Sequence, residues 1–97
     1  MADAVTVPPD RYKVVEENDK VRILEFRGGQ GDKTEIHSHP AVVAVALSAA
    51  DVRFTIPGGQ TMEIGMSAGH AIYMDAAEHA TEILSSSEAH VILIELK

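Results

Sequence analysis

The sequence predicts an all-β domain, an antiparallel sandwich or barrel, and three observations support this. About nine short segments rich in branched and aromatic residues follow one another at roughly ten-residue spacing, with turn residues between them. No stretch sustains the 3.6-residue apolar period of an amphipathic helix. The segment 52–56 alternates apolar and polar residues, as a half-buried strand does. Together these features are typical of sandwiches and barrels.

The chain of 97 residues has room for one domain only. Pro8 and Pro9 resist both helix and central strand, so we expect residues 1–11 to form an N-terminal arm that is ordered only against a partner. The barrel domain is expected to cover residues 12–97.

The first half of this domain contains four predicted strands. Segments 14–15 and 21–26 are rich in branched and aromatic residues, and Asn18-Asp19 forms the turn between them. A glycine-rich turn follows, and 33–39 is again extended until Pro40 interrupts it. Segment 41–47 is short and almost wholly apolar, which predicts a strand buried on both faces.

The second half begins with the clearest β signal. Segment 52–56 alternates, and Pro57-Gly58-Gly59 closes a hairpin onto 61–64. The remaining strands are expected at 70–74, 79–84 and 89–96, because Gly, Asp and Ser residues separate these apolar segments.

Charge and composition exclude several functions. Eight basic residues against fifteen acidic ones give a net charge of −7, the wrong sign for a protein that binds a phosphate backbone, so we expect no nucleic-acid partner. Without cysteine there are no disulfides and no thiolate ligands. The longest apolar run is far shorter than the ~20 residues that span a bilayer. The start does not resemble a signal peptide, so we expect a cytoplasmic protein without membrane contact.

Two histidines, His37 and His39, stand two residues apart before Pro40. In a strand, side chains at i and i+2 point to the same face, so both imidazoles would enter one space. A helix would separate the two rings by roughly 200° and prevent joint ligation. The pair therefore predicts a metal site on a strand. Without a metal, the same histidines would be polar residues at a barrel rim or hydrogen-bonded groups of the core.

From Gly31 onward the chain resembles the cupin family. Gly31 followed by His37-Ser38-His39-Pro40 is similar to the first cupin motif, and Gly69 followed by His79 is similar to the second. The resemblance covers most of the chain from Tyr12 onward. It implies a double-stranded β-helix, or jelly-roll barrel, with a metal held in its mouth by His37, His39 and His79.

The chain departs from the cupin pattern in two places. Where the family usually carries a metal-binding glutamate, four or five residues after the second histidine, this chain has Val43 and Ala44. Val43 is expected to point at the metal and to shield it. The Pro-x-Gly turn that usually precedes the third histidine is also missing, which leaves the register of His79 less well defined.

Three neutral imidazoles would leave coordination positions open, as catalytic sites do. Fe, Mn, Ni, Cu and Zn all accept imidazole, so the identity of the divalent ion is not determined by its ligands. Glu35 has the parity of His37 and His39 and is a candidate fourth ligand or general base, although a solvated glutamate at the start of a strand is the commoner case.

Three functions are compatible with such a centre. The first is a dioxygenase-like enzyme acting on a small molecule chelated to the metal, since three-histidine centres resemble those of thiol and diketone dioxygenases. The second is a cupin that binds a small molecule or a metal without turnover. The third is an isomerase or lyase that uses the metal as a Lewis acid and Glu35 as the base. Fold alone does not choose among them.

We also expect a homodimer, because a small barrel with an apolar sheet face has edges that a second copy would cover. Cupins often dimerise through sheet faces or exchanged terminal strands, and the resemblance implies the same for this chain. Phe54, Met62, Met66, Tyr73 and Met74 could wall a ligand pocket, although aromatic and Met residues on strands more often belong to an ordinary core.

Overall fold

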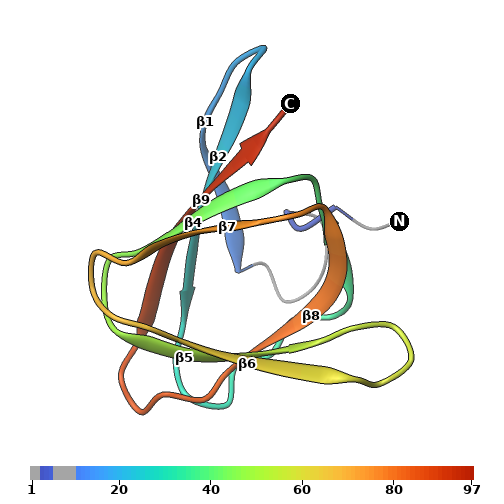
Figure 1. The fold of residues 1–97 in the computed structure, drawn as a ribbon. Helices are drawn as coiled ribbons and strands as arrows, with labels where there is room; N and C mark the ends of the chain where they lie inside the picture. The colour runs from blue at the N-terminus through green and yellow to red at the C-terminus, as the bar shows by residue number, and fades with distance from the viewer. Residues whose placement is uncertain (1–2, 6–10) are drawn as a thin grey trace.

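The computed structural model describes residues 3–5 and 11–97, which form two antiparallel sheets that face each other (Figure 1). The first sheet has the strand order β1-β2-β9-β4-β7 and the second has the order β3-β8-β5-β6. The strands are β1 (Tyr12–Glu17), β2 (Val21–Gly28), β3 (His37–His39), β4 (Val42–Ala46), β5 (Ala50–Thr55), β6 (Thr61–Met66), β7 (Ala71–Met74), β8 (Ala77–Ile83) and β9 (Ala89–Leu96).

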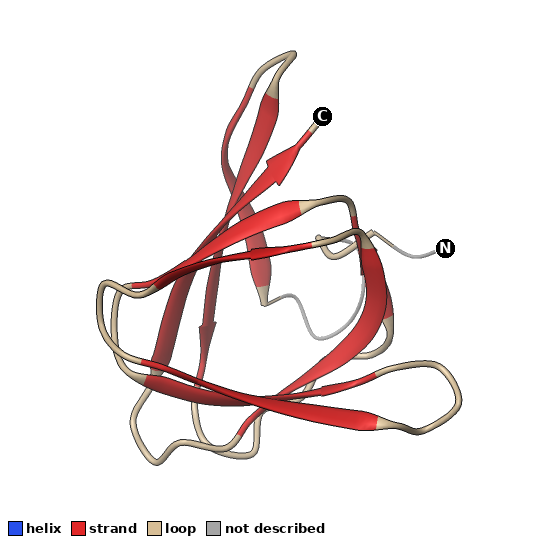
Figure 2. Ribbon diagram, viewed as in Figure 1, coloured by secondary structure: helices blue, strands red, loops and turns tan. Residues whose placement is uncertain are grey.

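The predicted jelly-roll class is confirmed, and each predicted strand has a counterpart. The described part of the chain consists of strands and loops alone (Figure 2). None of its segments is a helix long and apolar enough to cross a membrane. The hairpin of β1 and β2 extends beyond the rest of the barrel (Figure 1), and its residues 13–20 are exposed.

The core lies between the two sheets. Alternate residues of β4, β8 and β9 are buried between the sheets. The fully or almost fully buried residues of the core include Leu24 of β2, Ala46 of β4, Ile83 of β8 and Ala89 of β9. Gly31, in the loop before β3, has φ of 85°, a backbone conformation that glycine adopts without steric cost.

Two sequence predictions were wrong in detail. The predicted strand 33–39 shortens to β3, and residues 33–36 form a loop in which only Lys33 makes an isolated bridge, with Glu82. Strand β4 is not buried on both faces, because Val42, Ala44 and Ala46 are buried whereas Val43 and Val45 are half-buried. Val43 and Val45 lie on the outer face of the sheet, where they are half-buried. The apolar run 41–47 therefore shows that both faces of this strand are apolar, not that both are buried.

Part of the predicted N-terminal arm packs on the domain itself. Asp3 forms a parallel bridge with Ser38 of β3, and Ala4 is 1% exposed within the core. These two residues thus cover the edge of the strand that carries the histidine pair. Residues 6–10 of the arm, with Pro8 and Pro9, lie outside the described residues.

Candidate metal centre

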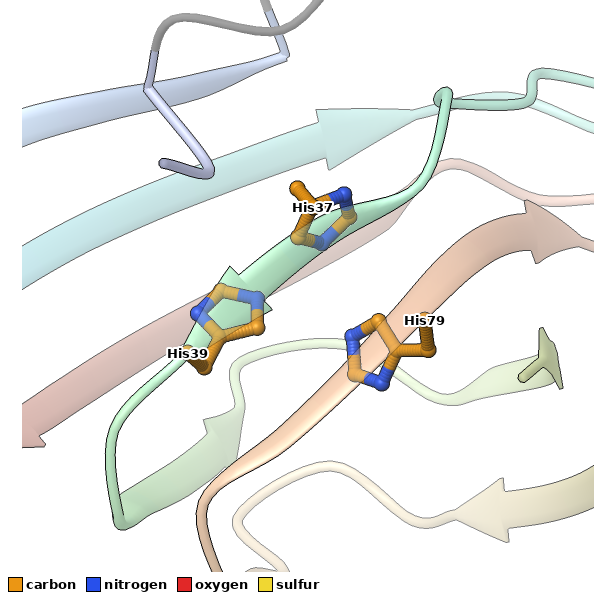
Figure 3. A group of neighbouring side chains, drawn as sticks. All are labelled: His37, His39 and His79. Atoms are coloured by element: carbon orange, nitrogen blue, oxygen red, sulfur yellow. The ribbon is translucent and has the colours of Figure 1, made fainter. Parts of the chain in front are cut away.

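Strands β3 and β8 bring the three predicted histidines together. His37 lies directly opposite His79 in the antiparallel pair, and His39 follows two residues later on the same face of β3 (Figure 3). One ring nitrogen of each histidine lies within 4.8 Å of the corresponding nitrogens of the other two. Their exposed fractions are 0%, 5% and 7% for His37, His39 and His79 respectively. The structure thus places His79 directly opposite His37, a register that the sequence left less well defined.

His37 is oriented by the backbone just before β3. Its Nδ1 lies 2.9 Å from the carbonyl oxygen of Glu35. A carbonyl only accepts hydrogen bonds, so the proton of a neutral His37 ring sits on Nδ1 and leaves the Nε2 lone pair bare. Nε2 is buried and has no hydrogen-bond partner.

His39 is oriented by a carboxylate from the closing strand. Its Nδ1 lies 2.7 Å from Oε2 of Glu95 on β9, and both side chains are almost fully buried. An ionised carboxylate also only accepts, so Nδ1 donates and Nε2 is again bare. This second Nε2 is buried without a partner as well.

His79 is held by an aromatic contact. The ring of Phe54 on β5 stacks on it at a centroid distance of 4.3 Å and an interplanar angle of 17°. Burial, reinforced by the neighbouring imidazoles, lowers the pKa of His79 to about 3. Burial also lowers the pKa of His37. Both rings are therefore neutral at physiological pH, which is the form that binds metals.

The unpartnered nitrogens fit a metal ion. Buried polar atoms in folded proteins nearly always have a hydrogen-bond partner. Among the described residues only three buried side-chain nitrogens or oxygens lack one, and two of these are the Nε2 atoms of His37 and His39. Two bare lone pairs beside a third imidazole supply the N-donor set of a three-histidine centre.

Tyr12 of β1 walls this cluster without joining it. Its ring makes edge contacts with His37 and His39 at centroid distances of 4.9 and 5.3 Å. Its hydroxyl lies 3.0 Å from Oγ1 of Thr81, and burial raises its pKa. Tyr12 therefore restricts how the two imidazoles can turn, while its oxygen is engaged elsewhere.

Glu35 is not part of the cluster through its side chain. It is exposed and lies in the loop before β3. The alternation of a strand, which would point it to the same side as His37, therefore does not apply to it. Its contribution to the site is the backbone carbonyl that accepts from His37. A catalytic role for the Glu35 carboxylate remains a prediction.

The expectation that Val43 points at the metal was wrong. Val43 is half-buried and lies opposite Ile94 and Tyr73 on the outer face of its sheet. Ala44, the next residue, is buried and lines the barrel interior beside His79. Of the two residues at four and five positions after His39, only Ala44 faces the interior, and its small apolar side chain cannot ligate a metal.

Sequence reasoning missed Glu95 and Arg22. Glu95 continues the inward-facing series Ala89, Val91 and Leu93 of β9 and is 2% exposed. An acidic residue at an inward position of a closing strand was the available signal, since Glu is rarely buried unless it is paired. Its partners come from β2 and β3, which are distant in sequence.

A small apolar cavity of about 40 Å³ lies between the sheets beside the cluster. Of the five residues that could either wall a pocket or belong to the core, Phe54, Met66 and Met74 line this cavity, whereas Met62 and Tyr73 are exposed. No charged side chain contributes to the lining. Its polar members are Tyr12, His79 and Thr81.

No family model matches the sequence, and no curated protein matches it either. Solved structures do match. A cupin domain from Bordetella pertussis is 24% identical, with a TM-score of 0.79 over 89% of this chain and 91% of that one. An RmlC-like cupin with a double-stranded β-helix from Methanocaldococcus jannaschii is 12% identical, with a TM-score of 0.69 over 99% and 84%.

A variant of oxalate decarboxylase from Bacillus subtilis is 16% identical, with a TM-score of 0.64 over 89% of this chain and 24% of that protein. At these identities the likeness concerns the fold. With two antiparallel sheets in jelly-roll arrangement and these structural neighbours, the chain has the double-stranded β-helix fold of the cupins.

Proposed function

We propose that the protein binds one divalent metal ion through His37, His39 and His79 and acts as a dioxygenase-like enzyme on a small molecule. The observation that carries the metal proposal is the pair of buried Nε2 atoms without partners beside a third buried imidazole. Three protein ligands leave room for a substrate, which distinguishes this set from a closed structural site. Such an ion would act as a Lewis acid toward a chelated substrate and, if redox-active, would support dioxygen chemistry.

The lining of the cavity favours a substrate with an apolar body, and the metal ion itself would hold any charged group of that substrate. No cationic side chain lines the cavity, so an anionic group there would have no protein countercharge. A compact, largely apolar molecule with a chelating group suits both the lining and the open coordination positions.

The alternatives are weaker on specific grounds. A Lewis-acid isomerase or lyase needs a general base at the reacting atoms, and the candidate Glu35 is exposed. Binding without turnover would use the same centre and cavity. It differs from the proposed enzyme in that the metal-loaded protein would form no product from a bound small molecule. The cytoplasmic location remains a prediction.

The first test measures metal by elemental analysis of protein purified without an affinity tag, followed by titration of the metal-free protein with Mn(II), Fe(II), Zn(II) and Cu(II). We expect one ion per chain. His37→Ala, His39→Ala and His79→Ala should each weaken binding by at least ~10-fold, because two imidazoles remain.

The matched control is His70→Ala, which removes an exposed histidine and leaves the cluster intact. This variant should bind like the wild type. Stoichiometric, undiminished metal in the His37→Ala, His39→Ala double variant would refute the proposal.

A further inference from the structure

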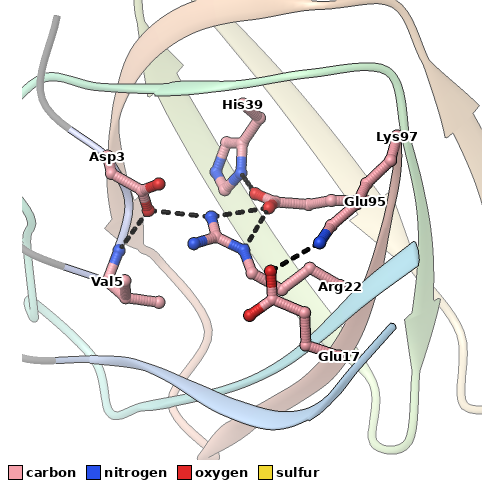
Figure 4. Close-up of polar contacts among 7 residues, drawn as sticks. All are labelled: Asp3, Val5, Glu17, Arg22, His39, Glu95 and Lys97. Atoms are coloured by element: carbon pink, nitrogen blue, oxygen red, sulfur yellow. Dashed lines mark hydrogen bonds and ion pairs between the residues drawn. The ribbon is translucent and has the colours of Figure 1, made fainter. Parts of the chain in front are cut away.

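We propose that Glu95 is a positioning residue that fixes the proton of His39 on Nδ1, and that Arg22 sets which kind of hydrogen-bonding atom the side chain at position 95 presents to His39. This inference deepens the proposed function, because the Nε2 lone pair of His39 is available to a metal only when the proton is on Nδ1. It rests on a chain of contacts that joins the N-terminal segment to the histidine cluster (Figure 4).

The two oxygens of Glu95 are divided between two partners. Oε2 lies 2.7 Å from Nδ1 of His39. Oε1 lies 2.8 Å from Nε of Arg22 and 2.6 Å from its Nη2. Arg22 also contacts Asp3, with 2.8 Å between Nη2 and Oδ1. The buried carboxylate therefore has a permanent cation on one side and an imidazole on the other.

Arg22 fixes which atom of the side chain at position 95 faces it. A guanidinium has only donors, so whatever faces it must be an acceptor. A carboxylate presents an acceptor to Arg22 and to His39 at the same time. Because Glu95 offers His39 nothing but an acceptor, the neutral ring must carry its proton on Nδ1.

Glu95→Gln should reverse this preference without changing the shape of the side chain. The amide oxygen would turn to Arg22, because the amide NH₂ facing a guanidinium would oppose donor to donor. The NH₂ group would then face Nδ1 of His39, which could accept only by losing its proton to Nε2. That proton would occupy the position from which the ring binds a metal.

The first experiment reads the tautomer in metal-free protein by ¹⁵N–¹H correlation of the histidine ring nitrogens. We expect Nδ1–H for His39 in the wild type and Nε2–H in Glu95→Gln. This readout does not require that the protein bind metal, so it tests the positioning role separately from the proposed function. A wild-type His39 protonated on Nε2 would overturn the inference, whether or not any variant folds.

The second experiment titrates the variants with Co(II), whose visible spectrum reports the ligands of the ion. Glu95→Gln should bind ~10- to 100-fold more weakly than the wild type, the usual effect of losing the group that orients a metal-binding histidine. The control is Glu17→Gln, which changes an exposed glutamate near the same network that pairs with Lys97 and not with Glu95 (Figure 4). It should bind like the wild type.

The decisive variant combines Glu95→Gln with Arg22→Met. Without the guanidinium the amide is free to turn its oxygen toward His39, so Nδ1–H and most of the Co(II) affinity should return. A role in packing or in overall charge predicts no such rescue, because a second buried contact has been removed. Persistence of the Nε2–H tautomer and of weak binding in the double variant would overturn the role of Arg22. Failure of the wild type to bind Co(II), with His39 protonated on Nδ1, would refute the proposed function alone.

Discussion

Each histidine of the cluster is held by a different kind of group, namely a backbone carbonyl, a carboxylate and an aromatic ring. For His37 and His79, protonation would place a charge in a buried site beside other imidazoles, and the pKa of each is lowered. For His79 the neighbouring cationic forms of His39 and His37 add to the effect of burial on its pKa. Keeping the rings of His37 and His79 neutral in the folded protein therefore lowers its stability in acid.

This predicts a specific pH dependence of folding. The unfolded His79 takes up a proton near its ordinary pKa of 6.5, whereas the folded residue does so only near its lowered pKa of about 3. Between these values the unfolded state holds more protons, so stability falls as the pH falls. The contribution of His79 should amount to about 2 kcal/mol between about pH 7.5 and pH 5.

Urea unfolding of the metal-free protein at several pH values measures this slope. His79→Gln, which does not titrate, should show a shallower fall in stability across the same range. Equal slopes for the wild type and the variant would contradict the lowered pKa.

At the scale of the strand, the sequence predicts the histidine pair well and its surroundings less well. His37 and His39 share a face because any strand alternates, and that needs no knowledge of the partner strand. Glu35 fails the same argument because β3 begins only at His37. Val43 fails because the loop between β3 and β4 resets the alternation, so counting from His39 does not tell which residue faces inward.

The inward orientation of Ala44 can be tested with a carboxylate. Ala44→Glu would place an unpaired acid in an apolar cavity and should destabilise the metal-free protein by several kcal/mol. Because Ala44 and His79 line the same cavity, added Mn(II) should restore stability by supplying a countercharge. Thermal unfolding with and without Mn(II) measures both effects.

Val43→Glu is the matched control for this experiment. Its side chain lies on the outer face, so Mn(II) should raise its melting temperature no more than that of the wild type. An Ala44→Glu protein that Mn(II) does not stabilise would show that the cavity and the histidine cluster are separate.

At the scale of the whole molecule, the register between distant strands determines what sequence reasoning could not supply. Glu95 meets His39 across 56 residues, and Asp3 reaches Arg22 across 19. The first contact crosses from one sheet to the other, and the second follows from the packing of the N-terminal segment against β3. Local patterns predict the class of fold and the three histidines of the cluster, whereas the groups that orient these histidines depend on tertiary pairing.

The outer face of the five-stranded sheet is apolar at its centre. Val43 lies between Ile94 and Tyr73, Ile94 pairs with Ile23 on its other side, and Val45 lies beside Ile92. An antiparallel sheet with one face toward solvent ordinarily carries polar residues there. Charged residues enter these rows only toward β1, where Glu16 lies opposite Ile23 and Glu25 opposite Ile92, so the part of the face on β4, β7 and β9 is apolar and two copies can approach through it.

We therefore expect a homodimer in which two copies pack these sheet faces together about a two-fold axis, an arrangement that makes the same apolar patch complementary to itself. Val43→Glu should convert it to a monomer, because a carboxylate at the centre of the interface would be buried without a partner. The control is Thr61→Glu, which adds the same charge at an exposed position of β6 in the other sheet and should leave the dimer intact. Sedimentation velocity at micromolar concentration measures all three proteins. A monomeric wild type, or a Val43→Glu variant that sediments as the wild-type dimer does, would show that this face is not the interface.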